Sequence, residues 1–216
     1  MTQLDTQSLT YVVREPKVPS AHPPVLFLLH GLGSNETDLL SLATQFPPRY
    51  LVVCVRAPRD LGGGRYAWYR VDFSTGKPVY DFADVEESVA LLGVLMSEVR
   101  EKYATSDDVY VGGFSQGGIM SYMLGLTHPE RVKVIIVMSG RLLEEVKSLV
   151  ANEEERQHLR VFISHGVDDA TLPIEYGREG ASYLRSLHMN PAYTEYPGGH
   201  SISDAMLTDL IRWLNE

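Results

Sequence analysis

The sequence has one cysteine, no long apolar run and few basic residues. Cys54 lies inside the apolar run 51–55 and has no partner in the chain, so it is expected to be an inert core residue of a protein from a reducing compartment. No apolar segment approaches the roughly 18 residues that span a bilayer, and residues 1–5 lack the pattern of a signal peptide. The sequence therefore predicts a cytoplasmic protein without stable membrane insertion.

The shortage of positive charge restricts the partners. Nineteen Lys and Arg against 28 Asp and Glu give a net charge of −9. Nucleic-acid binding is disfavoured, because it depends on cations that replace the counterions of the phosphates. The apolar fraction of 44% is typical of a globular protein, and 216 residues without an internal repeat or linker predict one domain, 1–216. A homo-oligomer is compatible with the sequence, which does not specify one.

Short apolar runs alternate with segments of helical spacing. Continuous rather than alternating hydrophobicity is typical of strands that are buried on both faces. Helical spacing is clearest in residues 83–103 and in the last segment, around 207–214. This alternation predicts an α/β domain with a mostly parallel sheet and helices on both faces. The predicted strands are 25–29, 51–55, 109–111, 132–138, 159–163 and 192–196.

Two stretches do not follow this pattern. Residues 57–80 contain three consecutive glycines, two prolines and several aromatic residues, so they are expected to form a long ordered loop over the top of the sheet. Residues 144–158 are strongly charged and are expected to form a solvated helix face or an exposed connection.

Residues 113–117 read G-F-S-Q-G and match the G-x-S-x-G pattern of a nucleophile elbow. A predicted strand precedes them and a helical segment, 116–126, follows, which is the context that this motif requires. The sharp turn would expose the hydroxyl of Ser115 at the carboxyl edge of the sheet, at the positive end of the following helix. Without that context, the motif would indicate only a glycine-rich turn that allows close packing.

A serine nucleophile needs a base and an acid, which follow it in the order Asp or Glu, then His. His200 is the candidate base, because it lies in a flexible turn between the last strand and the last helix. His165 precedes the expected acid, which is the wrong order. Three further histidines lie in charged connections or at a helix end and are expected at the surface: His128, His158 and His188.

The acid is expected in the loop after strand 159–163, which contains Asp168 and Asp169. Spacing alone does not choose between them. The oxyanion hole is expected to use the backbone N–H groups of Gln116, directly after the serine, and of Leu32, in the glycine-rich loop after strand 25–29. That loop matches neither phosphate-binding glycine pattern, so we discard a phosphate site.

Four motifs in this order resemble those of the small carboxylesterase/phospholipase family of α/β-hydrolases, which includes bacterial carboxylesterases and acyl-protein thioesterases. They are HGLG at 30–33, GFSQGG at 113–118, HGxxDxxxP at 165–173 and GH at 199–200. The resemblance implies the α/β-hydrolase fold, and the chain is too short to add a large lid domain. It also selects Asp169 as the acid, because that aspartate lies four residues after the histidine of the third motif.

The resemblance further implies a serine carboxylesterase that hydrolyses small esters, thioesters or lysophospholipid-like esters through an acyl-enzyme, with a small-molecule ester as its substrate. No metal and no organic cofactor are implied. Trp68 is the candidate substrate-binding residue, the alternative being that the aromatic side chains of 57–80 only fill the space between loop and sheet. Two other interpretations stay open: another Ser-His-Asp hydrolase or acyltransferase (a thioesterase, peptidase or lactonase), and a non-catalytic binding protein with this fold.

Overall fold

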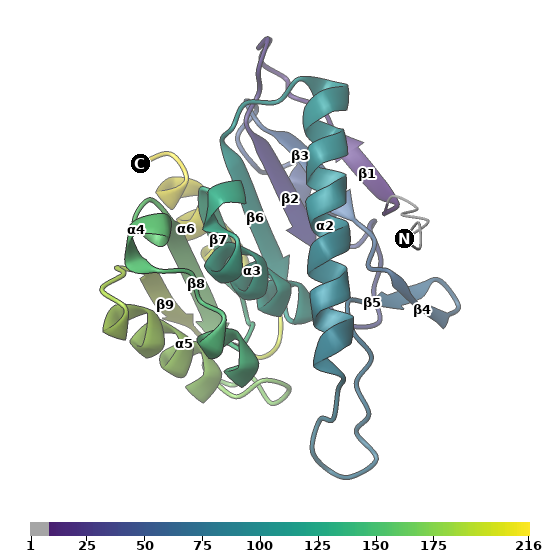
Figure 1. Ribbon diagram of the computed structural model, residues 1–216, viewed down its shortest axis with the longest axis vertical. Helices are drawn as coiled ribbons and strands as arrows, with labels where there is room; N and C mark the ends of the chain where they lie inside the picture. The colour runs from purple at the N-terminus through teal and green to yellow at the C-terminus, as the bar shows by residue number, and fades with distance from the viewer. Residues whose placement is uncertain (1–8) are drawn as a thin grey trace.

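The computed structural model describes residues 9–216, and a seven-stranded sheet forms its centre (Figure 1). The strand order is β1-β3-β2-β6-β7-β8-β9. β1 pairs antiparallel with β3, and the remaining neighbours are parallel. The strands are β1 (Tyr11–Arg14), β2 (Val25–Leu29), β3 (Leu51–Val55), β6 (Val109–Phe114), β7 (Val134–Met138), β8 (Arg160–Gly166) and β9 (Ala192–Tyr196).

Both faces of the sheet are covered by helices, as the continuous apolar runs predict. On β2, Val25, Phe27 and Leu29 belong to one hydrophobic core, and Leu26 and Leu28 belong to another on the opposite face. Helices α2, α3 and α5 pack on the first face, which points to the viewer in Figure 1, and α1 and α6 pack on the second. The helices are α1 (Leu40–Ala43), α2 (Phe82–Tyr103), α3 (Gln116–Thr127), α5 (Glu175–Ser186) and α6 (Asp204–Trp213). The predicted α/β-hydrolase architecture is confirmed, and residues 9–216 include no large lid.

Two strands, β6 and β8, extend further toward their carboxyl ends than their apolar runs suggest. The run that predicts a strand over 109–111 continues as β6 to Phe114, and the run over 159–163 continues as β8 to Gly166. Glycine and histidine carry little apolar signal, but ladder pairing with the neighbouring strand holds them in the sheet: Gly113 pairs with Val137, and His165 pairs with Glu195. This extension brings both strands to the edge where the candidate site lies.

Three further elements were not predicted. β1 adds an antiparallel strand at one edge of the sheet. Within 57–80, β4 (Arg59–Gly62) and β5 (Arg65–Ala67) form an antiparallel hairpin. The rest of that stretch is an extended loop before α2, which protrudes at the bottom of Figure 1. The glycines between β4 and β5 have positive φ, which is why a hairpin can turn there.

The charged stretch 144–158 is largely exposed, as predicted, and contains two short helical elements. They are η2 (Glu144–Ser148) and α4 (Glu153–Arg156), and a further short helix, η1 (Pro129–Arg131), precedes β7. Cys54 lies buried in β3, and burial raises the pKa of its thiol to about 12, so the thiol stays protonated as expected for a core cysteine. Among residues 9–216, no helix combines the length and the apolar character needed to cross a membrane.

Candidate active site

Ser115 lies at a sharp turn between β6 and α3, with φ 54° and ψ −116°. Such a conformation costs a non-glycine residue about 1–3 kcal/mol and persists only where its surroundings enforce it. Two glycines make the turn possible. A Cβ on Gly113 would lie 2.2 Å from the backbone of Gly117, and a Cβ on Gly117 would lie 2.0 Å from the carbonyl oxygen of Leu29. The sequence therefore fixes this turn through its glycine spacing.

His200 lies in the turn after β9 and faces Ser115. Its Nε2 is 2.8 Å from the Ser115 Oγ, and its ring packs against Phe114 with the ring centroids 4.8 Å apart. The turn is possible because Gly198, with φ 119°, adopts a conformation that other residues rarely reach. The side chain of His200 is 18% exposed, so part of the ring is open to solvent.

Asp169 lies in the loop after β8 and contacts His200 on the side away from Ser115. Its Oδ2 is 2.6 Å from Nδ1 of His200, and its Oδ1 accepts the backbone N–H groups of Thr171 (2.9 Å) and Leu172 (2.8 Å). The carboxylate is fully buried. Asp168 is exposed, and its backbone N–H donates to the carbonyl of Gly198. The two adjacent aspartates thus have different surroundings, and only Asp169 contacts the imidazole.

These contacts define the protonation that the arrangement can use. Because a carboxylate can only accept, Nδ1 of His200 carries the proton that it donates to Asp169. Nε2 is then free to accept the hydroxyl proton of Ser115. The arrangement can therefore take a proton from Ser115 and stabilise the resulting imidazolium, which is the chemistry of a serine hydrolase. We call Ser115, His200 and Asp169 the relay.

His165 lies next to Asp169 and bonds the loop that carries it. It is fully buried, and its Nε2 donates to the carbonyl of Leu172 (2.7 Å) and lies 3.5 Å from Asp169 Oδ2. Its Nδ1 has no hydrogen-bond partner among the described residues, and its ring packs closely on Gly177. Its place in the third motif was visible in the sequence, but this supporting contact was not predicted.

The segments that carry the two expected oxyanion donors, Gln116 and Leu32, both lie close to Ser115. Gln116 is the first residue of α3, where backbone N–H groups have no partner within the helix. The loop that carries Leu32 passes close by, since a Cβ on Gly31 would lie 3.4 Å from the Ser115 Cβ. The side chain of Leu32 is 40% exposed.

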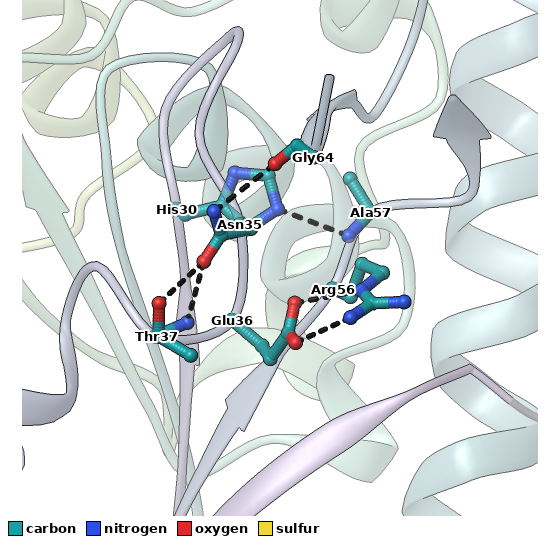
Figure 2. A network of polar contacts seen from close by, with 7 residues as sticks. All are labelled: His30, Asn35, Glu36, Thr37, Arg56, Ala57 and Gly64. Carbon is teal, nitrogen blue, oxygen red and sulfur yellow. Dashed lines mark hydrogen bonds and ion pairs between the residues drawn. The ribbon is translucent and has the colours of Figure 1, made fainter. Parts of the chain in front are cut away.

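A network of polar contacts holds the loop that carries Leu32 in place (Figure 2). His30 is 1% exposed; its Nε2 accepts the Ala57 N–H (3.1 Å), and its Nδ1 donates to the Gly31 carbonyl (2.7 Å). Burial lowers the pKa of His30, so the ring is neutral with the proton on Nδ1. Further along the loop, Glu36 and Arg56 form a two-bond ion pair of 2.7 and 2.5 Å.

Trp68 and the side chain of Gln116 extend this hydrogen-bond network. The Trp68 indole donates to the His30 carbonyl (2.9 Å), and the Trp68 backbone N–H donates to Oε1 of Gln116 (2.8 Å). Nε2 of Gln116 donates to the Tyr69 carbonyl (2.8 Å). Trp68 is fully buried, which favours the alternative in which it fills the space below the loop. We call the side chains of His30, Trp68 and Gln116 the oxyanion framework.

Within residues 9–216, no cluster of three or more His, Cys, Asp or Glu side chains could hold a metal ion. The remaining candidate bases lie elsewhere. His128 and His188 lie near Glu130 and Glu153 on the surface, and His158 bonds the carbonyl of Pro129.

Known proteins resemble this chain in sequence and in fold. The family model for phospholipases/carboxylesterases matches residues 10–216. The chain belongs to this family. It is 32% identical over 215 residues to acyl-protein thioesterase 1 of Gibberella zeae (91% of this chain, 92% of that protein), and 26% identical over 204 residues to the carboxylesterase SOBER1 of Arabidopsis thaliana (86% and 87%). The solved carboxylesterase of Bacillus cereus superposes with a TM-score of 0.82 at 22% identity and covers 96% of this chain and 93% of that one. With these relatives, the chain is a hydrolase of ester or thioester bonds.

Proposed function

We propose that this protein is a serine carboxylesterase that hydrolyses small carboxylic esters, with Ser115 as nucleophile, His200 as base and Asp169 as the acid that orients the base. The observation that carries the proposal is the unbroken relay, Ser115 Oγ to His200 Nε2 at 2.8 Å and His200 Nδ1 to Asp169 Oδ2 at 2.6 Å. It comes from three segments that are far apart in the sequence. A binding protein with this fold would have no need to keep all three groups in contact.

The reaction follows from these positions. Ser115 Oγ attacks the ester carbonyl as His200 Nε2 takes its proton, and the backbone N–H groups of Gln116 and Leu32 bind the oxygen that becomes negative. His200 then returns the proton to the departing alcohol, which leaves the acyl group on Ser115. Water repeats the attack with His200 as base and releases the acid. Asp169 stays ionised throughout and stabilises the imidazolium. No cofactor takes part.

Labelling with a fluorophosphonate and hydrolysis of p-nitrophenyl esters test the proposal. We expect the label on Ser115 by peptide mapping, and its loss in Ser115→Ala. An acyl-thioester series and an amide series, measured on the same preparation, distinguish the related reactions. Hydrolysis of amides without hydrolysis of esters would contradict the proposal, and faster turnover of thioesters than of esters would move the preferred substrate to thioesters.

A further inference from the structure

Arg141 lies beside the candidate site but takes no part in the relay. It follows β7, the strand next to the one that carries Ser115. The backbone just before it packs on the first turn of α3, since a Cβ on Gly140 would lie 3.0 Å from the backbone of Gly118. The guanidinium therefore leaves the sheet at its carboxyl edge, from a loop in contact with the helix that begins after Ser115.

Two aromatic side chains flank the guanidinium. Its central carbon lies 5.7 Å from the ring of Tyr80 and 5.5 Å from the ring of Tyr176. Tyr80 in turn packs on Tyr69, with ring centroids 5.3 Å apart, and the Tyr69 carbonyl accepts from Gln116. Burial raises the pKa of Tyr69, and the charge of Arg141 acts in the opposite direction, which places the cation near that phenol.

The tyrosines around Arg141 lie on both sides of the reacting serine. Tyr69 lies on the oxyanion side, bonded to Gln116. Tyr176 lies at the start of α5, and the next residue, Gly177, packs on His165 beneath the relay. A cation held between these two tyrosines is thus placed at the edge of the site, between its oxyanion side and its acid side.

Arg141 has no ion-pair partner in the described part of the chain. Glu145, the acid that contacts Tyr80, accepts the hydroxyl of Tyr80 at 3.0 Å. The side chain is only partly exposed, in a protein with a net charge of −9. One N–H group of the guanidinium is within reach of the Tyr69 phenol, and the aromatic rings leave its other in-plane N–H groups able to donate. A planar fork of N–H groups matches a carboxylate.

We propose that Arg141 selects ester substrates that carry a free carboxylate, which it binds through its guanidinium while Ser115 attacks the ester carbonyl. The proposal rests on the proposed esterase function and names its substrate class. A carboxylate is favoured over a phosphate dianion, because a single guanidinium carries one positive charge and its planar fork matches the two oxygens of a carboxylate. Hydrolysis releases a dicarboxylate when the charge is on the acyl part, and a carboxylate-bearing alcohol when it is on the alcohol part.

Paired substrates of equal shape test the proposal. For the acyl part, the p-nitrophenyl half-ester of adipate is compared with the p-nitrophenyl ester of a neutral acid that ends in an isopropyl group. For the alcohol part, an aryl acetate with a para carboxylate is compared with the same acetate with a para carboxamide. We expect kcat/KM to favour the charged member of at least one pair by roughly tenfold or more, the usual size of a charge-assisted hydrogen bond.

Arg141→Gln should bring this ratio down to about one. Lys133→Gln is the matched control. It removes the same charge from the other end of β7, where Lys133 pairs with Asp108 at 2.7 Å, and should leave the ratio and the activity unchanged. The dicarboxylate adipate should inhibit the parent protein competitively and Arg141→Gln much less.

Two outcomes would overturn the proposal. One is a ratio near or below one for both pairs in the parent protein. The other is an equal loss on charged and neutral substrates in Arg141→Gln, with a lower unfolding midpoint, which would make Arg141 a purely structural contact between the tyrosines. Failure of the esterase function looks different, because no ester would be turned over and Ser115 would not react with the fluorophosphonate.

Discussion

The two sides of Ser115 are built in different ways. The relay side reaches the serine through His200, a partly exposed side chain in a turn, and only Asp169 is anchored by backbone donors. The oxyanion framework is wholly buried, and each of its side chains bonds to the backbone of another segment. In the proposed reaction one side carries the proton transfers, and the other holds backbone in place. Substitutions on the two sides should therefore differ in whether they lower activity alone or activity and stability together.

Ser115→Ala gives the largest expected effect on the relay side. We expect turnover of p-nitrophenyl butyrate to fall by about 10⁶, the loss found when the nucleophile of such a triad is removed. The urea unfolding midpoint should stay within error of the parent, because the hydroxyl fills no space in the core. Ser186→Ala, on the surface of α5, is the control and should change neither quantity. A clear loss of stability in Ser115→Ala would contradict the division between the two sides.

Asp169→Asn should lower turnover by roughly 10⁴, because the amide no longer stabilises the imidazolium and favours the wrong tautomer of His200. The neighbouring substitution Asp168→Asn removes the same charge from an exposed side chain and should cost little. Steady-state kinetics on both variants make the test. Equal losses would show that the acid of the relay is assigned wrongly.

Gln116→Ala should lower both activity and stability, in contrast to the relay variants. It leaves the Trp68 N–H and the Tyr69 carbonyl buried without partners, which costs about 1–3 kcal/mol each. Because the neighbouring backbone then loses its position, we expect turnover to fall roughly ten- to hundredfold. Urea unfolding and kinetics on Gln116→Ala, with the surface variant Gln45→Ala as control, measure both effects. Unchanged stability would contradict the structural role of this side chain.

Substitution of His30 should have a smaller effect, which is on the pH dependence of the free energy of unfolding. Burial lowers its pKa, so the unfolded chain binds a proton near pH 6.5 that the folded protein does not. The stabilisation is complete above about pH 6.5 and declines as the pH falls from there toward the folded-state pKa. His30→Gln should remove this part of the slope. The free energy of unfolding in urea between pH 7.5 and 5.5 measures it, and an identical slope in parent and variant would rule out this role for His30.

Much of the fold and of the relay was readable from the sequence because the signals are local. Apolar runs marked the six parallel strands, and the glycine spacing around Ser115 marked the turn. The β4–β5 hairpin was not predicted, because three glycines and a short exposed strand carry no apolar pattern. Trp68 was a candidate for substrate contact, but nothing in its local sequence indicates that its indole bonds to His30, 38 residues earlier.

The sequence by itself determined the parallel sheet, the strained turn at Ser115 and the order of nucleophile, acid and base, because strand propensity and the absence of a Cβ on Gly113 and Gly117 act over a few residues. Spacing alone left Asp168 and Asp169 open and the third motif selected Asp169, whereas tertiary structure alone decided what the Gln116 side chain holds and where Arg141 lies. Each of those depends on the distance between segments tens of residues apart, such as Ser115 and His200, 85 positions apart. The parallel pairing of β6, β7, β8 and β9 in one sheet sets that distance.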